Sequence, residues 1–576
     1  MSKTDTTIAC LLALIVAAIL LPFASIGVDP HHDGIMLKPA LDVLSGQVLF
    51  RDTFMQYGAL TCYLEVLALW LLPSLLALKY LVVAVYGITL FFLYGVWRLM
   101  LPRSLTLLAC GLFVLFIPYY ESQWTMVPWS SEFALMFQAV ALFALGQVLR
   151  GKEPVAWALM LGLTTACVFW CRQPVGILMV GALLVIGVVL KLTGWTWPAA
   201  VAPRATLKAF ATGFILVNGL LLGGIVLSGS FPAWWYQNFI WPKQWAIQGG
   251  SYEWNAHAPI FLHPANGLML LALLFGLAAP GLINRIKPVF SRKHLVIYYL
   301  ILAGLLALKH DVIRPLLLWP EGGWSVVIPF ALILQTSVLI GWFSLRKAAR
   351  PAEDYRLIAF SGIALAALVQ YYPVPCARHI FWSLAPAFGL FVHLVWRWTG
   401  WRPLVVFIVL GGAFAPMIST KITAAREKLT QPLTTLSMPS VLRGMRVSPQ
   451  EASEYEQIDA TLRPLVARAP QTPSAMIGYD ALFLCFTPER RNPSPYFVTW
   501  GGLLSAEQSK ARWEQIFKTR PILFIQTPRN SKLERSYENE GYVPLLKISG
   551  TYLLIAAPAE LVTAVSQGKA PGIAPK

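Results

Sequence analysis

Long apolar stretches recur along the first three quarters of the chain. From residue 8 to residue 418 they come in windows of about 17–22 residues, separated by short polar loops. About 20 apolar residues are needed for an α-helix to cross the hydrocarbon core of a bilayer. The pattern therefore predicts a polytopic α-helical membrane protein. About thirteen spans are expected, at residues 8–27, 79–98, 104–120, 131–149, 154–171, 174–191, 208–228, 262–283, 295–309, 325–344, 357–373, 380–397 and 402–418.

One further apolar run, residues 58–76, does not fit this series. Loops rich in Lys and Arg favour the cytoplasmic side of a membrane. The basic loops, among them 98–103, 150–152 and 397–402, all fall on one side only if residues 58–76 do not cross. We therefore expect this run to form a juxtamembrane or re-entrant helix. On this topology the N-terminus is cytoplasmic and the thirteenth span ends outside.

The pattern changes after residue 420. Charge rises, polar turns appear, and short apolar segments alternate with helix-like ones, which is typical of a small α/β domain. The strand-like segments are 475–479, 522–526 and 552–557, and the helix-like segments are 451–468 and 505–518. We therefore divide the chain into a transmembrane domain at 1–420, with a first external loop at 28–78, and an extracytoplasmic domain at 421–576.

Charge and cysteine content narrow the class of protein. The chain is 57% hydrophobic and 12% charged, and its net charge is +18. In a soluble protein this charge would suggest nucleic acid, but here the basic residues lie mostly in loops between spans, where topology and anionic lipids account for them. We expect no nucleic-acid partner. The seven cysteines show neither a disulfide framework nor zinc-ligand spacing.

The first external loop concentrates charge beside an apolar run. Asp29-Pro30-His31-His32-Asp33-Gly34 follows the first span directly, and Arg51-Asp52 comes soon after. Charge at the mouth of a membrane domain is costly to place and marks a working site. A carboxylate near hydrocarbon has a raised pKa and accepts a proton from a hydroxyl or amine. Asp33, Asp29 and Asp52 are the catalytic candidates, and the alternative for Asp52 is a loop ion pair with Arg51.

Other external loops add cations and aromatic residues. Arginine at a membrane surface binds phosphate or pyrophosphate in bidentate fashion, and aromatic rings suit the faces of sugars. The alternative for such residues is an interaction with lipid headgroups. The substrate-binding candidates are Arg378, His379, Arg172, His32, Arg51 and Lys243.

Together these groups describe glycosyl transfer from a polyprenyl-phosphate donor. The acceptor attacks the anomeric carbon, the lipid phosphate leaves, and cations or a divalent metal stabilise the developing charge. A zinc site built from His31 and His32 is not favoured, because adjacent histidines do not easily bind one ion. No metal ligands are predicted, and the need for a divalent cation stays open.

Two segments of the first loop resemble a known family. His32-Asp33-Gly34 and the later run from Gly46 to Phe54 resemble the first periplasmic loop of bacterial C-type (GT-C) membrane glycosyltransferases. This superfamily includes protein O-mannosyltransferases, the lipid A aminoarabinose transferase and lipopolysaccharide-core galacturonosyltransferases. Cys171-Arg172-Gln173-Pro174 and Arg378-His379 are also similar to family segments. The family usually has Asp-Glu where this chain has His32-Asp33, so the base is expected to be Asp33 or Asp29.

The resemblance implies a multi-pass enzyme of the bacterial inner membrane, with its active site and C-terminal domain on the periplasmic side. Such an enzyme transfers a hexose or pentose from a polyprenyl-phosphate carrier to an extracytoplasmic glycan, lipid or protein, and is surrounded by membrane lipids. Two alternatives remain at this stage: an O-antigen ligase or polymerase, and a transporter of lipid-linked sugars. A transporter would be expected to show inverted repeats, and none is visible in the sequence.

Overall fold

The structure is a computed structural model, and it describes most of the chain. The described residues are 1–117, 126–192, 195–198, 201–245, 297, 352–371, 377–400, 402–487, 492–498, 503–526, 536–548 and 553–567. The spans predicted at 262–283, 295–309 and 325–344 lie outside these residues, apart from position 297.

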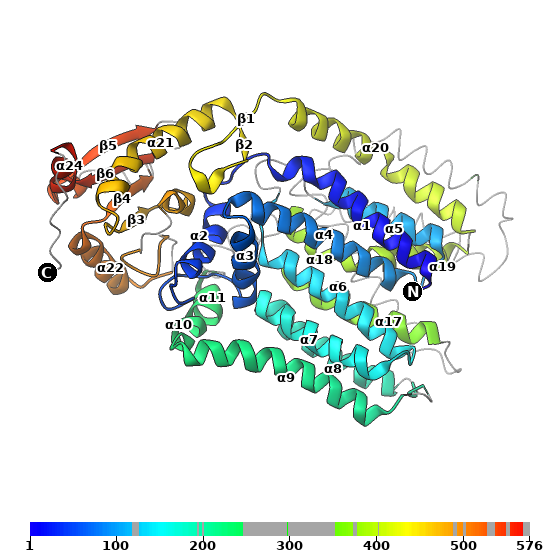
Figure 1. Cartoon of the computed structure of the whole chain (residues 1–576). Coiled ribbons are helices and arrows are strands. Elements are labelled where there is room, and N and C mark those ends of the chain that lie inside the picture. Colours follow the sequence, from blue (N-terminus) through cyan, green and yellow to red (C-terminus); the bar gives the residue numbers. More distant parts are fainter. Residues whose placement is uncertain are drawn as a thin grey trace, which may run out of the picture.

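Helices make up nearly all of the described chain before residue 430 (Figure 1). Their bounds follow the predicted apolar runs closely, although most differ from them by a few residues. The helices are α1 (Lys3–Ala24), α2 (His32–Leu44), α3 (Ala59–Leu71), α4 (Leu75–Trp97), α5 (Arg103–Phe116), α6 (Ser130–Leu149), α7 (Pro154–Cys171), α8 (Gln173–Leu192), α9 (Pro203–Leu227), α10 (Phe231–Trp235), a π-helix (Tyr236–Ile240), α11 (Trp241–Trp245), α17 (Ala352–Ala367), the 3-10 turn η3 (Leu368–Tyr371), α18 (Ala377–Leu384), the 3-10 turn η4 (Ala385–Ala387), α19 (Phe388–Thr399) and α20 (Pro403–Thr430).

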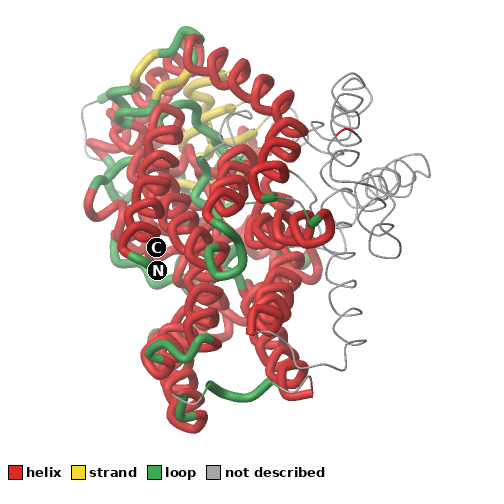
Figure 2. The backbone as a smooth tube through the Cα atoms, turned by 90° about the vertical axis from the view of Figure 1, so that its right-hand side faces the viewer, coloured by secondary structure: helices red, strands yellow, loops and turns green. Residues whose placement is uncertain are grey.

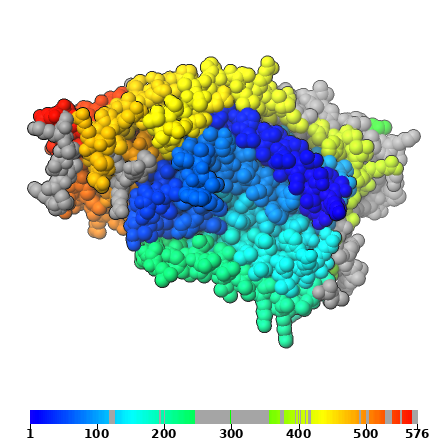
Figure 3. Space-filling model, viewed as in Figure 1, coloured from blue at the N-terminus to red at the C-terminus, as the bar shows by residue number. Residues whose placement is uncertain are grey.

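Six of the described helices are long and apolar enough to cross a membrane: α1, α4, α6, α7, α8 and α9. Helix α5 has 14 residues and is shorter than the span expected at 104–120. The outer faces of several helices are strongly apolar, since Leu14 is 65% exposed, Leu184 is 69% exposed and Leu227 is 90% exposed. Figure 3 shows α1, in dark blue, lying along the surface of this face. Large exposed aliphatic side chains of this kind suit contact with lipid.

Helix α3 belongs to the apolar run that we expected not to cross. Its 13 residues span about 20 Å at 1.5 Å per residue, which is less than the hydrocarbon core of a bilayer. The N–H of Gly58, just before α3, donates to the carbonyl of Cys171 over 3.1 Å. A Cβ at Gly58 would lie 2.0 Å from the carbonyl oxygen of Trp170, so only glycine allows this approach. The start of α3 is thus held against the end of α7.

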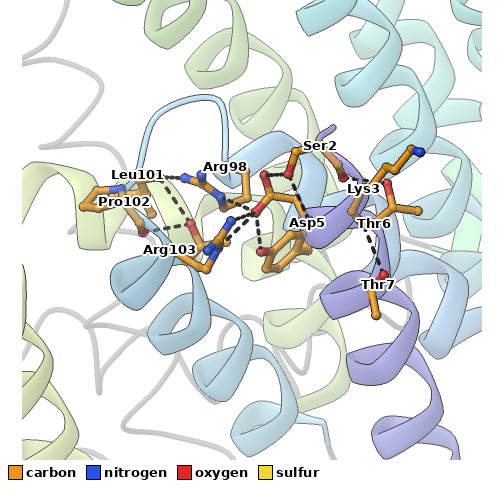
Figure 4. A network of polar contacts seen from close by, with 11 residues as sticks. Ser2, Lys3, Asp5, Thr6, Thr7, Arg98, Leu101, Pro102 and Arg103 are labelled. Atoms are coloured by element: carbon orange, nitrogen blue, oxygen red, sulfur yellow. Dashed lines mark hydrogen bonds and ion pairs between the residues drawn. The ribbon is translucent and has the colours of Figure 1, made fainter.

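The first turn of α1 is tied to the loop between α4 and α5. Asp5 accepts hydrogen bonds from Tyr94 at 3.1 Å, from Arg98 at 3.1 Å and from Arg103 at 3.2 Å (Figure 4). The side chain of Ser2 also donates to Asp5 over 2.8 Å. The N-terminus therefore lies at the same end of the helices as a basic loop, and the first external loop lies at the other end of α1.

The C-terminal region contains the described strands, which gather in one part of the molecule (Figure 2). Its main sheet has the order β3-β4-β6-β5, with β3 parallel to β4 and the other pairs antiparallel. The strands are β1 (Thr434–Thr435), β2 (Arg446–Val447), β3 (Ser474–Ile477), β4 (Ile522–Gln526), β5 (Tyr542–Ile548) and β6 (Leu553–Pro558). The other elements here are the 3-10 turns η5 (Ser440–Leu442) and η6 (Ala481–Phe486) and the helices α21 (Pro449–Arg468), α22 (Ala506–Thr519), α23 (Ser536–Asn539) and α24 (Ala559–Ser566).

The predicted strand and helix segments of this region are confirmed by β3, β4, β6, α21 and α22. Strand β5 was not predicted, because its burial does not alternate and its pairing with β6 is irregular between Pro544 and Leu546. Proline is tolerated in an edge strand, where its missing N–H is not needed. Both helices begin at a capping box, with Ser448 and Glu451 at α21 and with Ser505 and Gln508 at α22.

The C-terminal region packs directly on the first loop. The N–H of Leu482 in η6 donates to the carbonyl of Pro30 over 3.1 Å, and a Cβ at Gly34 would lie 2.1 Å from the same nitrogen. Residues 25–27 also pair with Arg446 through backbone hydrogen bonds of 2.6 and 2.8 Å. Helix α20 runs without a break across position 420, so a single helix connects the membrane part to this region.

Candidate functional site

Asp29 is held by the start of α2. One carboxylate oxygen accepts the backbone N–H groups of His31 (3.0 Å) and His32 (2.9 Å), and the other bonds to Nδ1 of His32 at 2.8 Å. Carboxylates at a helix N-terminus are stabilised by these N–H groups. Burial favours the neutral acid, but the bonds from His32 and the charges of both histidines outweigh it and hold the pKa of Asp29 below its ordinary value. Asp29 is therefore ionised and fixed in place.

Asp33, the first candidate for the base, is fully buried in an ion pair. Its carboxylate lies 2.5 Å from Nζ of Lys79 in α4, and it also accepts the N–H of Asp29 at 2.9 Å. Burial raises the pKa of Asp33, while the charge of Lys79 opposes this. Sequence reasoning missed Lys79, although a lysine at the first position of a predicted span, near an acidic loop, was a usable signal.

A second buried network organises the later part of the loop around Asp42. Its carboxylate pairs with Lys38 one turn earlier in α2, and both side chains are fully buried. Asp42 also accepts from Gln47 at 3.0 Å and from Thr53 at 2.7 Å. This network fixes the chain on both sides of the Arg51-Asp52 dipeptide. It was not predicted, although Lys38 and Asp42 have the four-residue spacing of a helical ion pair.

Asp52 and Arg51 form a partly exposed ion pair with one another. Two nitrogens of Arg51 donate to the two oxygens of Asp52, each over 2.9 Å, and Asp52 also accepts the N–H of Val48. Arg51 donates to the carbonyl of Ser228 over 3.2 Å. The arrangement is the local ion pair considered as the alternative for Asp52. The catalytic role of Asp52 and the substrate-binding role of Arg51 stay predictions.

Four of the predicted substrate-binding residues come from three elements, and two of them contact the ring of Trp129. His32 lies at the start of α2, Arg172 ends α7, and Arg378 and His379 begin α18. The ring of Trp129, just before α6, lies 5.0 Å from the His32 ring and 5.3 Å from Cζ of Arg378. The latter distance is typical of a cation–π contact. We call His32, Arg172, Arg378 and His379 the cationic cluster.

The electrostatics of two neighbouring residues confirm that these charges lie close together. Burial, together with the charges of His31 and Arg378, lowers the pKa of His32 to about 4 against the opposing effect of Asp29. Burial also raises the pKa of the Tyr57 hydroxyl, and the charges of Arg172 and Arg378 oppose this shift. Both guanidinium groups therefore lie within electrostatic range of Tyr57, whose ring is 5.8 Å from that of Trp129.

Two carboxyl groups are buried near the cluster, on α3 and α6. Glu132 accepts a hydrogen bond from the Tyr86 hydroxyl at 2.9 Å. Neither carboxyl oxygen of Glu65 has a hydrogen-bond partner among the described residues, and this side chain is fully buried. Ionisable side chains at membrane depth are costly and mark functional sites. Neither glutamate was among the predicted site residues.

Lys243 lies elsewhere. It is exposed on the short helix α11, and no described contact joins it to the cationic cluster. Its substrate-binding role stays a prediction. Among the described residues, no group of three or more His, Cys, Asp or Glu side chains is arranged to hold a metal ion.

Comparison with known proteins finds similarity only among solved structures. No protein-family model matches the chain, and no curated protein matches it. The oligosaccharyltransferase of Archaeoglobus fulgidus, in complex with Zn and sulfate, is 13% identical with a TM-score of 0.49, over 91% of this chain and 68% of that one. ArnT from Cupriavidus metallidurans in the apo state is 12% identical with a TM-score of 0.47, over 96% of this chain and 98% of that one.

A second structure of the same ArnT, bound to undecaprenyl phosphate, is 11% identical with a TM-score of 0.47. At these identities and TM-scores, similarity alone supports no function for this chain, so we argue function from its own residues.

Proposed function

We propose that this protein is a membrane glycosyltransferase that moves a sugar from a polyprenyl-phosphate carrier to an extracytoplasmic glycan, lipid or protein. The observation that carries the proposal is that the members of the cationic cluster lie within electrostatic range of one another, with His32 and Arg378 against the ring of Trp129. Arg172 and Arg378 are far apart in the chain, yet both act on the Tyr57 hydroxyl, and Arg378 also acts on His32. Two guanidinium groups gathered in this way suit the binding of an anion such as a phosphate.

The chemistry of the cluster fits a phosphate leaving group. Guanidinium groups bind phosphate oxygens in bidentate fashion, and they stabilise the charge that develops when the bond from phosphate to the anomeric carbon breaks. A buried site strengthens these interactions, because water screens them less. The rings of Trp129 and Tyr57 offer apolar faces to a sugar. The first loop, which carries Asp29 and Asp33, supplies the acceptor side of the reaction.

The distribution of charge along the chain supports a site on the periplasmic side of the membrane. The loops at the N-terminal end of α1 are basic, with Arg98 and Arg103 bound to Asp5, whereas the acidic first loop lies at the other end. By the positive-inside tendency the basic end is cytoplasmic. We infer a multi-pass protein of the bacterial inner membrane whose site and 421–576 domain face the periplasm. The domain that packs on Pro30 and Gly34 then closes the site from the aqueous side.

A transfer assay tests this function. Purified protein is given a labelled polyprenyl-phosphate sugar and an acceptor extract, and covalent transfer is measured. We expect transfer by the wild type and a loss of about 100-fold in Arg378→Gln and in Arg172→Gln, as when a transition-state donor is removed. Arg463→Gln is the matched control, because Arg463 is exposed on α21 and pairs only with Asp459 among the described residues.

Three outcomes would contradict the proposal. Transport of the labelled lipid across vesicles without covalent transfer would indicate a transporter. Transfer that requires a lipid-pyrophosphate donor would indicate a ligase or polymerase of the O-antigen type. Full transfer by a variant carrying both arginine substitutions would remove the cationic cluster from the mechanism.

A further inference from the structure

The contacts of His32 single it out among the groups of the first loop. This residue stands where the family that the loop resembles usually has a carboxylate. We propose that His32 is the general base that takes the proton from the acceptor, and that Asp29 is the positioning residue that orients the imidazole. The proposal rests on the proposed function, and it names the group that activates the acceptor in that reaction.

The geometry around Asp29 fixes the tautomer of His32. One oxygen of Asp29 is occupied by two backbone N–H groups, so the carboxylate cannot rotate away without losing them. Its other oxygen lies 2.8 Å from Nδ1 of His32. An ionised carboxylate only accepts hydrogen bonds, so Nδ1 carries the hydrogen and Nε2 becomes the basic nitrogen of the ring. The same arrangement of carboxylate and imidazole activates nucleophiles in hydrolases of several folds.

The surroundings of His32 keep it neutral and next to the donor site. The titratable and charged groups that act on its ring are Asp29, His31, Arg378 and His379. Only Asp29 favours the imidazolium form, and burial and the cations favour neutral imidazole. Because the Trp129 ring is in range of both His32 and Arg378, the base lies beside the residue proposed to bind the donor phosphate.

The two carboxylates of the loop are less suited to take the proton themselves. Asp33 is fully buried and bound to Lys79. Asp29 accepts three hydrogen bonds, which occupy both of its carboxylate oxygens. Proton transfer to Asp33 would disturb the ion pair that joins α2 to α4. By contrast, the bond from His32 to Asp29 strengthens when the imidazole ring becomes charged.

The proposed step balances in atoms and charge. An acceptor hydroxyl gives its proton to Nε2 of His32 while its oxygen forms a bond to the anomeric carbon of the donor sugar. The bond between that carbon and the phosphate oxygen breaks, and its electron pair leaves with the lipid phosphate beside Arg378. The resulting imidazolium is stabilised by Asp29. It then returns its proton to water or to the released phosphate.

Substitutions at His32 test the proposal in the full-length protein. We expect His32→Gln to lower kcat by at least about 100-fold while the labelled polyprenyl-phosphate sugar still binds, since positioned general bases contribute about 100- to 10000-fold. We expect Asp29→Asn to lower kcat and to move the acid limb of the pH–rate profile to lower pH, because Asp29 raises the pKa of His32. Full activity of His32→Gln would overturn the proposal and leave the proposed function standing.

Chemical rescue shows whether a His32 variant loses activity because the base is missing or because the structure is disturbed. In His32→Gly, added imidazole should restore transfer in proportion to its concentration, because it supplies the missing base. His31→Gly is the matched control, since the imidazole of His31 bonds to the carbonyl of Tyr479 instead, and it should show no rescue. If imidazole fails to restore transfer in His32→Gly although the donor still binds, the proposal that His32 is the general base is wrong. Failure of the wild type to transfer would overturn the proposed function and this inference together.

Discussion

The neutral state of His32 has a consequence for stability at the scale of single residues. Its pKa falls from 6.5, its ordinary value, to about 4 in the folded protein, because it is buried. Between these two pH values the unfolded chain binds more protons, so the free energy of unfolding rises with pH through this window. The difference between the two pKa values corresponds to about 3 kcal/mol. The stability that neutral His32 gives is therefore lost as the pH falls from 6.5 to 4.

This prediction is checked by unfolding the protein in detergent at pH 7.5 and pH 4.5. The wild type should lose more stability than His32→Gln between these values, by up to about 3 kcal/mol. The comparison isolates His32, because His31 and the other histidines are common to both proteins. Equal losses in the two proteins would show that His32 does not titrate in this window.

The buried ion pair of Asp33 and Lys79 predicts a large loss of stability when Lys79 alone is replaced by an uncharged residue. Lys79→Met leaves the buried carboxylate without its counter-ion, and breaking a buried pair in this way costs about 3–5 kcal/mol. A double variant, Asp33→Asn with Lys79→Met, removes both charges and should recover part of the loss. Free energies of unfolding in detergent measure both variants. A single variant as stable as the wild type would show that the pair is not formed.

The residues of the site were predictable to different degrees. His32, Arg172, Arg378 and His379 could be found because charged groups are rare in this chain and stand out at the ends of apolar runs. The choice among acids could not be made, because it depends on partners far away in the sequence. Lys79 neutralises Asp33, and this contact exists only when α2 packs beside the start of α4.

At the scale of elements, the close contact between α2 and η6 predicts that one methyl group added at Gly34 lowers the stability of the protein. In Gly34→Ala the added Cβ would lie 2.1 Å from the backbone nitrogen of Leu482, so the two elements must separate. We expect a loss of about 1–3 kcal/mol, as for overpacked cores, and faster proteolysis of residues 421–576. Gly111→Ala is the control, because nothing lies within 4 Å of its Cβ and alanine favours helices. Equal stability of the two variants would contradict the close packing.

The elements themselves were largely predictable from the apolar pattern, with two instructive differences. Helix α5 ends at Phe116, earlier than its apolar run suggested, because apolar content reports burial and lipid contact but not where a helix stops. Helix α20 continues to Thr430, beyond the expected domain boundary, since its polar last turns are still good helix formers. Amino-acid composition placed the change from apolar to polar sequence near residue 420, and helix α20 continues across that position.

At the scale of the whole molecule, helix α3, which we expect not to cross the membrane, decides the orientation of everything after it. Ser45 ends α2 in the first external loop, and Lys152 lies in the basic loop between α6 and α7. Helices α4, α5 and α6 connect the two loops in addition to α3. If α3 does not cross and α5, the shortest of the other three, does, three crossings separate Ser45 from Lys152 and put them on opposite sides. If α3 crosses, there are four, and both residues lie on the same side.

Labelling of single cysteines resolves this topology. In a cysteine-free background, Ser45→Cys, Lys152→Cys and Lys510→Cys each place one thiol at an exposed position. A membrane-impermeant maleimide added to intact spheroplasts should label position 45 and position 510, because the C-terminal domain packs on the first loop, and should label position 152 only after permeabilisation. Labelling of both 45 and 152 without permeabilisation would mean that α3 crosses or that α5 does not. Labelling of position 45 only after permeabilisation would contradict the proposed periplasmic site.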